Sequence, residues 1–135
     1  MIRTLTVEPA GPGLLEITRQ VQEIVRQSGL AEGLATLFVQ HTSASLLVQE
    51  NDDPQVRRDL ENWFARLIPE QDPLFTHTAE GPDDMPSHIR GALTAVSLSI
   101  PVLEGRLALG TWQGVFLWEH RRQRRARRIL IHLGA

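Results

Sequence analysis

The chain has 135 residues, of which 41% are hydrophobic and 22% charged, and its formal net charge is −2 at neutral pH. The length suits one domain over residues 1–135, and the composition is that of a globular protein rather than a disordered chain. The absence of cysteine excludes disulfides, thiolate nucleophiles and cysteine-ligated zinc.

Charge and hydropathy also limit the partners that we expect. A nearly balanced net charge gives no global field that would attract nucleic acid, so we expect no nucleic-acid partner. No apolar run approaches the ~20 residues of a membrane span, and residues 1–9 lack the apolar core of a signal peptide. We therefore expect no membrane partner and a cytoplasmic location.

The first half of the chain is predicted to alternate strands and helices. Residues 2–8 alternate imperfectly between apolar and polar, which predicts a strand before the turn-rich residues 9–13. Apolar residues at helical spacing predict a helix over residues 17–28, with Gly29 as its C-terminal stop. Residues 34–40 and 45–49 are predicted strands, joined by a turn or bulge.

Two further helices are predicted in the middle of the chain. The sequence NDDP at residues 51–54 indicates a helix start, because an Asp cap accepts backbone N–H bonds and proline fits the first helical position. We expect this helix to end before Pro69. Pro86 is expected to begin a third, short helix that places His88 in its first turn, where the positive end of the dipole disfavours a protonated imidazole. His88 is therefore predicted to be a neutral ligand or acceptor.

The C-terminal part is predicted to be rich in strands. Strands are expected over residues 96–102, 106–109, 114–118 and 127–133, with a turn at residues 104–105. Helices that interrupt pairs of strands, followed by a β-rich end, are typical of an α+β fold. We predict a largely antiparallel sheet with two or three helices.

The connection around residues 77–88 has the highest density of proton carriers and potential metal ligands in the chain. It contains His77, Glu80 and His88, which we assign to a functional site. Asp83 and Asp84 are interpreted as turn-forming scaffold, with Asp84 kept as an alternative to Glu80 for handling protons or orienting a ligand. The spacing of the two histidines matches no recognised zinc signature. Metal binding and a purely structural role therefore remain equal alternatives on the residues alone.

Several residues in the C-terminal part have competing interpretations. Trp112 is either a core residue or a platform for a ligand ring, and Glu119 is a polar group in an apolar run that must be hydrogen-bonded or used. The arginine-rich residues 121–128 are interpreted as a solvated hairpin, with a functional role favoured only at its strand edge, because guanidinium forks suit phosphate. His120 and His132 are interpreted as surface or strand residues.

Four stretches, in this order and spacing, resemble one family: residues 40–45 (QHTSAS), 50–54 (ENDDP) with Asp59, 77–88, and 105–114 (GRLALGTWQG) with Glu119. They are similar to the secondary thiamine-phosphate synthase family, also called YjbQ-like, over residues 14–133. The resemblance implies a YjbQ-like sandwich that assembles as a homotrimer. It also implies a weak or secondary transferase activity that joins a pyrimidine pyrophosphate to a thiazole phosphate and releases pyrophosphate.

The resemblance further implies a site that uses a divalent metal ion, zinc or magnesium, and takes a small phosphorylated substrate. The expected metal ligands are His41, His77, His88 and Glu119. The expected catalytic residues are His41, His77, His88 and Glu80. The expected substrate-binding residues are Thr42, Ser43, Trp112, Gln113, Arg127 and Arg128. A metal-dependent phosphate-ester hydrolase and a non-catalytic binder of a small anionic metabolite stay open as alternatives.

Overall fold

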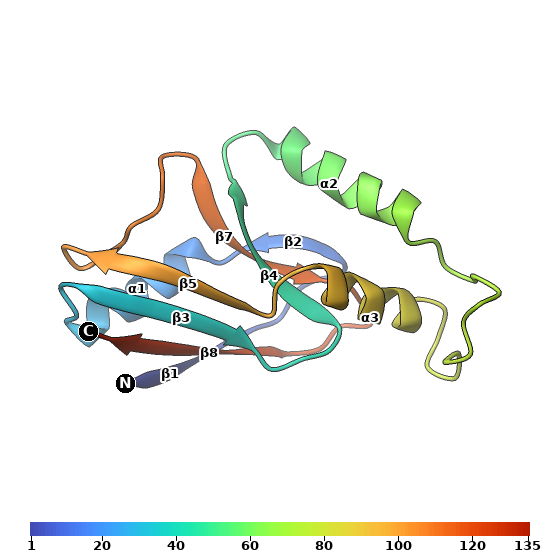
Figure 1. The fold of residues 1–135 in the computed structure, drawn as a ribbon, viewed down its shortest axis with the longest axis horizontal. Helices are drawn as coiled ribbons and strands as arrows, with labels where there is room; N and C mark the ends of the chain where they lie inside the picture. The colour runs from blue at the N-terminus through green and yellow to red at the C-terminus, as the bar shows by residue number, and fades with distance from the viewer.

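Two antiparallel sheets and three helices make up the computed structural model, which describes residues 1–135 (Figure 1). The large sheet has the order β1-β8-β3-β5-β6, with strands β1 (Ile2–Val7), β3 (Gly33–Val39), β5 (Ser97–Leu103), β6 (Arg106–Leu107) and β8 (Arg127–Gly134). The small sheet has the order β2-β7-β4, with strands β2 (Gly13–Glu16), β4 (Ala44–Glu50) and β7 (Gln113–Glu119). The helices are α1 (Thr18–Ser28), α2 (Pro54–Leu67) and α3 (Asp84–Leu93).

The hydrophobic core is formed by the inner faces of both sheets and by α1. Side chains alternate across a strand, so Ile129 and Ile131 of β8 point into the core while Arg128 is exposed. From the small sheet, Val115 and Leu117 of β7 join the same core.

The other face of the small sheet is covered by α2. Trp118 of β7 contacts Phe64 of α2 with ring centroids 4.8 Å apart, and the Arg57 guanidinium of α2 lies over the Phe116 ring. Burial on both faces explains why β7 is a continuous apolar run rather than an alternating one.

The α+β class, the antiparallel pairing and the three helices confirm the fold predicted from the sequence. Two helix boundaries have the expected causes: Asp53 caps α2 by accepting the Gln55 N–H at 2.9 Å, and Gly29 ends α1 in the left-handed conformation with φ of 73°. None of the three helices has the length and hydrophobicity needed to cross a bilayer.

Three details differ from the prediction. The strands form two sheets where the residue patterns alone predicted one, although the sandwich implied by the resemblance is confirmed, and β2 lies between the predicted turn and the first helix, where no strand was expected. The third helix begins at Asp84 rather than at Pro86, so His88 lies beyond the first turn. Pro86 is tolerated there because the first N–H groups of a helix have no intrahelical acceptor.

The close packing of β3 against the end of β8 leaves no room for a side chain at Gly33. Gly33 has φ of 154°, and a Cβ atom there would lie 2.2 Å from the carbonyl oxygen of Gly134. We expect Gly33→Ala to lower the free energy of unfolding by at least about 2 kcal/mol, because both the backbone and its neighbour must move. Urea denaturation measures this change.

The matched control is Gly11→Ala, since nothing lies within 4 Å of the Cβ position of Gly11. We expect the free energy of unfolding of this variant to lie within about 0.5 kcal/mol of that of the parent. Equal stability of the two variants would contradict the role assigned to Gly33.

Candidate functional site

Three side chains converge where the connection from α2 enters α3. Nε2 of His77 lies 2.8 Å from Oδ2 of Asp84, and Nε2 of His88 lies 3.2 Å from the same oxygen. Asp84 and His88 share one face of α3 because they are four residues apart. We call His77, Asp84 and His88 the histidine–aspartate cluster.

The cluster is open on its histidine side. The side chain of Asp84 is only 3% exposed, whereas the His77 and His88 side chains are 49% and 34% exposed. The carboxylate is thus held in the protein interior, and the imidazoles stand between it and solvent. A small ion or molecule can reach the imidazoles without a change in the fold.

The donor atoms of the cluster suit a divalent metal ion. Two imidazole nitrogens and one carboxylate oxygen form a typical zinc ligand set, and one donor atom from each residue lies within 4.8 Å of the others. With metal bonds of about 2.0–2.1 Å, donors around a tetrahedral zinc ion lie roughly 3.3 Å apart. The separations of 2.8 and 3.2 Å are close to that spacing. Without a metal, the His77 contact is a hydrogen bond to Asp84, whereas His88 only lies within ion-pairing distance of the same oxygen.

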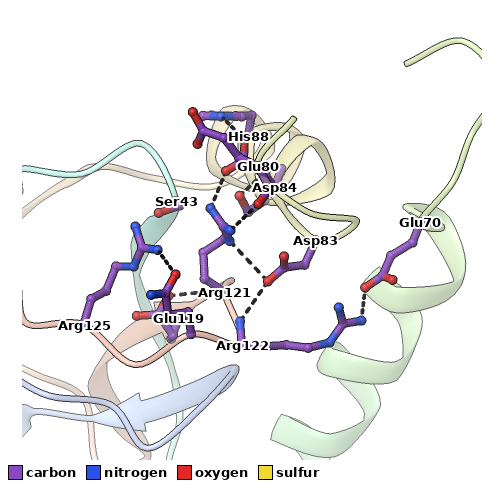
Figure 2. Close-up of polar contacts among 12 residues, drawn as sticks. Ser43, Glu70, Glu80, Asp83, Asp84, His88, Glu119, Arg121, Arg122 and Arg125 are labelled. Carbon is purple, nitrogen blue, oxygen red and sulfur yellow. Dashed lines mark hydrogen bonds and ion pairs between the residues drawn. The ribbon is translucent and has the colours of Figure 1, made fainter. Parts of the chain in front are cut away.

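Arg121, just after β7, holds the carboxylate of the cluster in place. Its Nη1 donates to Oδ1 of Asp84 at 2.5 Å, its Nε to Oδ2 of Asp83 at 3.2 Å, and its Nη2 to the carbonyl of Glu80 at 2.9 Å (Figure 2). These contacts tie the segment before α3 to the end of the small sheet. They also leave Oδ2 as the oxygen of Asp84 that faces the imidazoles.

Asp83 completes this clamp from the other side. Burial by itself would raise the pKa of the Asp83 carboxyl, but the backbone N–H of Arg122 and the guanidinium of Arg121 hold that pKa below its usual value. Asp83 is therefore an ionised anchor, whereas its neighbour Asp84 belongs to the cluster.

Glu119 and Arg127 form a separate, fully buried ion pair. Arg127 donates to both carboxylate oxygens of Glu119 and also to the carbonyl and hydroxyl of Ser43, and the two charged side chains are 2% exposed or less. Both oxygens of Glu119 are therefore engaged away from His77 and His88. Nε and Nη2 of Arg127 are likewise turned into the protein, although Arg127 also lines the cavity that contains His41.

His41 lies in a different cavity, of about 480 Å³, that Thr42, Ser43 and Arg125 also line. Its Nε2 accepts the backbone N–H of Arg128 at 2.9 Å. Burial lowers the pKa of His41, and the charge of Arg127 lowers it further. The structure thus groups His41 with Thr42 and Ser43, and places this group apart from the histidine–aspartate cluster.

The remaining candidates are dispersed. Trp112 is 58% exposed, which excludes the core alternative, and Gln113 accepts the backbone N–H of Gly110 at 2.7 Å. Arg128 is exposed on β8. Glu80 is exposed and contributes its backbone carbonyl to the clamp around Arg121.

Two interpretations of the chain after β7 are wrong. His120 was expected on the surface or in a strand, but it follows β7, is 2% exposed, and its Nε2 lies 2.9 Å from the hydroxyl of Ser45. The arginine run was expected to be solvated, yet Arg121 and Arg127 are buried. Both ends of this run adjoin strands, so their side chains are drawn into polar contacts inside the protein.

Asp84 is the member of the cluster that was not among the expected metal ligands, since scaffold was its favoured interpretation. The signal that identifies it is its spacing of four residues from His88 on a helix. A helix start placed at Pro86 leaves Asp84 outside the helix and conceals that spacing.

The fold and the site together define an α+β sandwich of two antiparallel sheets with an imidazole–carboxylate cluster beside its third helix. Residues 3–134 match the family described as UPF0047 protein YjbQ-like, and the chain belongs to this family. A UPF0047 protein of Synechocystis is 50% identical over 129 residues, which cover 96% of this chain and 88% of that protein. The UPF0047 protein YjbQ of Escherichia coli O157:H7 is 42% identical over 132 residues, covering 97% and 95% of the two chains.

Solved structures show the same fold. A conserved hypothetical protein from Thermus thermophilus is similar with a TM-score of 0.87 and 37% identity, covering 98% of this chain and 99% of that one. A hypothetical protein from Aeropyrum pernix has a TM-score of 0.88 at 25% identity and covers 100% and 98%.

These comparisons correct the expected activity. The family and the relatives are described as UPF0047 proteins with no activity attached. The assignment as a thiamine-phosphate synthase-like transferase is therefore wrong as a statement of function, although the YjbQ-like part of the resemblance is confirmed.

The buried His120 predicts a pH dependence of stability. Burial, with the charges of Arg90 and Arg127, lowers the pKa of His120 from 6.5 to about 3. Between these values the unfolded chain binds a proton that the folded chain does not, so stability falls as pH decreases from about 6.5 toward 3. This group contributes a slope of about 1.4 kcal/mol per pH unit. We expect His120→Gln to make the loss of stability between about pH 6 and about pH 4 less steep, as measured by urea denaturation at each pH.

The control is His132→Gln, which replaces an exposed histidine of β8. The stability of this variant should change with pH as steeply as that of the parent. An unchanged slope in His120→Gln would show that His120 does not titrate between the folded and unfolded states.

Proposed function

We propose that the protein is a metal-dependent hydrolase whose metal ligands are His77, Asp84 and His88. The observation that carries this proposal is the convergence of three donor atoms within 4.8 Å, with the carboxylate buried and the imidazoles partly exposed. Three protein ligands with solvent access match the catalytic type of zinc site, which keeps one position open. When bound, such an ion lowers the pKa of a water ligand and polarises a carbonyl group.

The protein supplies positioning through Arg121. Its contact with Oδ1 of Asp84 fixes the orientation of the carboxylate, so that Oδ2 is presented to the ion. Partners of this kind, which hold a metal ligand without touching the metal, typically change metal affinity by roughly 10–100-fold when removed. In this role Arg121 is a positioning residue.

The cavity beside the cluster supports an uncharged substrate. A cavity of about 470 Å³ is lined by Gln71, Asp72, Phe75, His77, Thr78, Gly81, Pro82 and Met85. None of these residues is a lysine or an arginine that would pair with phosphate, while Phe75 and Met85 provide apolar surface. A small uncharged ester fits this lining better than a phosphorylated compound does.

Metal analysis and ester hydrolysis test the proposal together. We expect protein purified without chelator to contain about one zinc ion per chain and to hydrolyse p-nitrophenyl acetate. Chelation should abolish hydrolysis, and added zinc should restore it. His88→Ala should lack both metal and activity, because two donors do not hold the ion.

His132→Ala is the matched control, since it removes an exposed histidine on β8 outside the cluster. Arg121→Gln should keep the three ligands but bind zinc roughly 10–100-fold more weakly. Full activity in chelated protein, or equal metal content in His88→Ala and His132→Ala, would refute the metal-dependent hydrolase.

We also propose that the outer face of the large sheet mediates assembly into a homotrimer, the state implied by the family resemblance. On β3, Ala35 and Leu37 face the core, whereas Leu34 and Phe38 are 42% and 46% exposed on the opposite face. These apolar side chains would be removed from water by association with a second copy.

Light scattering coupled to size-exclusion chromatography tests this assembly. We expect the mass of three chains for the parent and a smaller mass for Phe38→Asp, because a carboxylate would be buried in the interface. Leu74→Asp alters an apolar side chain that is 84% exposed in the connection after α2, and should remain a trimer. A monomeric parent would exclude the proposal.

A further inference from the structure

Arg90 on α3 carries a guanidinium group that no carboxylate contacts, although the charge of Glu70 acts on it from beyond ion-pairing distance. Its Nε is buried without a hydrogen-bond partner. The ion pairs of the chain involve other cations, so no acidic oxygen lies within 4.0 Å of the Arg90 side-chain nitrogens. A buried polar group without a partner costs about 1–3 kcal/mol, more when it is charged, so it calls for an explanation.

Arg90 lines a cavity of about 240 Å³ between α2, α3 and the small sheet. Phe64 of α2 and Trp118 of β7 form an aromatic wall, with ring centroids 4.8 Å apart. Asn62 on α2 adds an amide to the lining. The cavity thus combines apolar walls, which exclude water, with one unpaired cation.

The two acidic residues of this cavity form hydrogen bonds with groups other than Arg90, Glu119 through both oxygens and Glu61 through one. Glu119 is bound through both oxygens by Arg127, and Oε1 of Glu61 accepts the backbone N–H of Leu14 at 2.9 Å. Neither carboxylate lies within ion-pairing distance of Arg90. The hydrogen-bonding capacity of the Arg90 guanidinium is therefore left for a molecule from outside the chain.

A second buried nitrogen near Arg90 also lacks a partner. Nδ1 of His120 is buried and unpaired, and the charge of Arg90 is close enough to contribute to the lowered pKa of His120. When the Ser45 hydroxyl donates to Nε2 of this imidazole, Nδ1 carries the hydrogen and is itself a donor. A ligand that only accepts hydrogen bonds would satisfy both of these unpaired donors.

We infer that Arg90 forms a binding site for a small oxyanion, a phosphate or a carboxylate, in the cavity between α2 and α3. A guanidinium presents a planar fork of N–H donors that matches the paired oxygens of such anions. The aromatic wall strengthens this attraction because it lowers the local dielectric. The site is independent of the metal proposal, since none of the cluster residues lines this cavity.

Calorimetric titration of inorganic phosphate, and separately of acetate, into chelator-treated protein at constant ionic strength tests the inference. Chelation removes any metal that would itself bind an anion. We expect saturable binding of at least one anion by the parent, and at least a tenfold weaker affinity in Arg90→Ala. Phosphate binding would identify the phosphate class, and acetate binding the carboxylate class.

Arg58→Ala is the matched control, because it removes an exposed arginine of α2 that does not line the cavity. It should bind the anion as the parent does. Arg90→Lys keeps the charge without the fork and should bind severalfold more weakly, which provides a test if Arg90→Ala fails to fold by circular dichroism. Absence of saturable binding of both anions, or equal affinity in the parent and the folded Arg90 variants, would overturn the site.

Discussion

The buried ion pair between Glu119 and Arg127 joins the two sheets of this protein. Glu119 ends β7 in the small sheet, Arg127 begins β8 in the large sheet, and Arg127 also binds Ser43 just before β4. Removing two charges from water is unfavourable, and such a pair is maintained only when its geometry and additional hydrogen bonds are good. Loss of either partner would leave an uncompensated charge in the core. The chain must therefore pass from one sheet to the other along a path that keeps Glu119 and Arg127 in contact.

The chain between these two residues carries the clamp of the candidate site. Arg121 lies two residues beyond Glu119, and the Arg121 N–H donates to Oε1 of that carboxylate at 3.0 Å. The same residue then holds Asp83 and Asp84 through its side chain, while Arg122 pairs with Glu70 on the surface (Figure 2). Three members of the arginine run therefore have a structural role, because Arg121, Arg122 and Arg127 bind different carboxylates. Arg124 and Arg125 instead donate to uncharged oxygens, those of the Ala10 carbonyl and the Gln123 amide.

Local chemistry allowed much of the fold to be predicted. The Asp53 cap and Gly29 stop are decided within one turn of helix, and strand alternation is visible within a few residues. The residue patterns alone did not predict the division into two sheets, which only the resemblance implied, because it depends on which distant strands pair. In the site, His77 and His88 were identified from composition, whereas Asp84 was not predicted as a ligand because the helix start was placed two residues late. The burial of His120 could have been predicted from its spacing, because it lies two residues after Trp118 and four after Phe116, which are also buried. His120 itself lies one residue beyond the end of β7.

The charges around the cluster bear on the proposed metal site. Asp83 and Asp84 carry two negative charges and both contact Arg121, which carries one positive charge, so the three residues sum to −1. The remaining negative charge is concentrated on Asp84, whose carboxylate is buried and meets two imidazole nitrogens. Either a proton on an imidazole or a divalent ion would compensate it. Because metal ligands must be deprotonated, these two forms of compensation exclude each other.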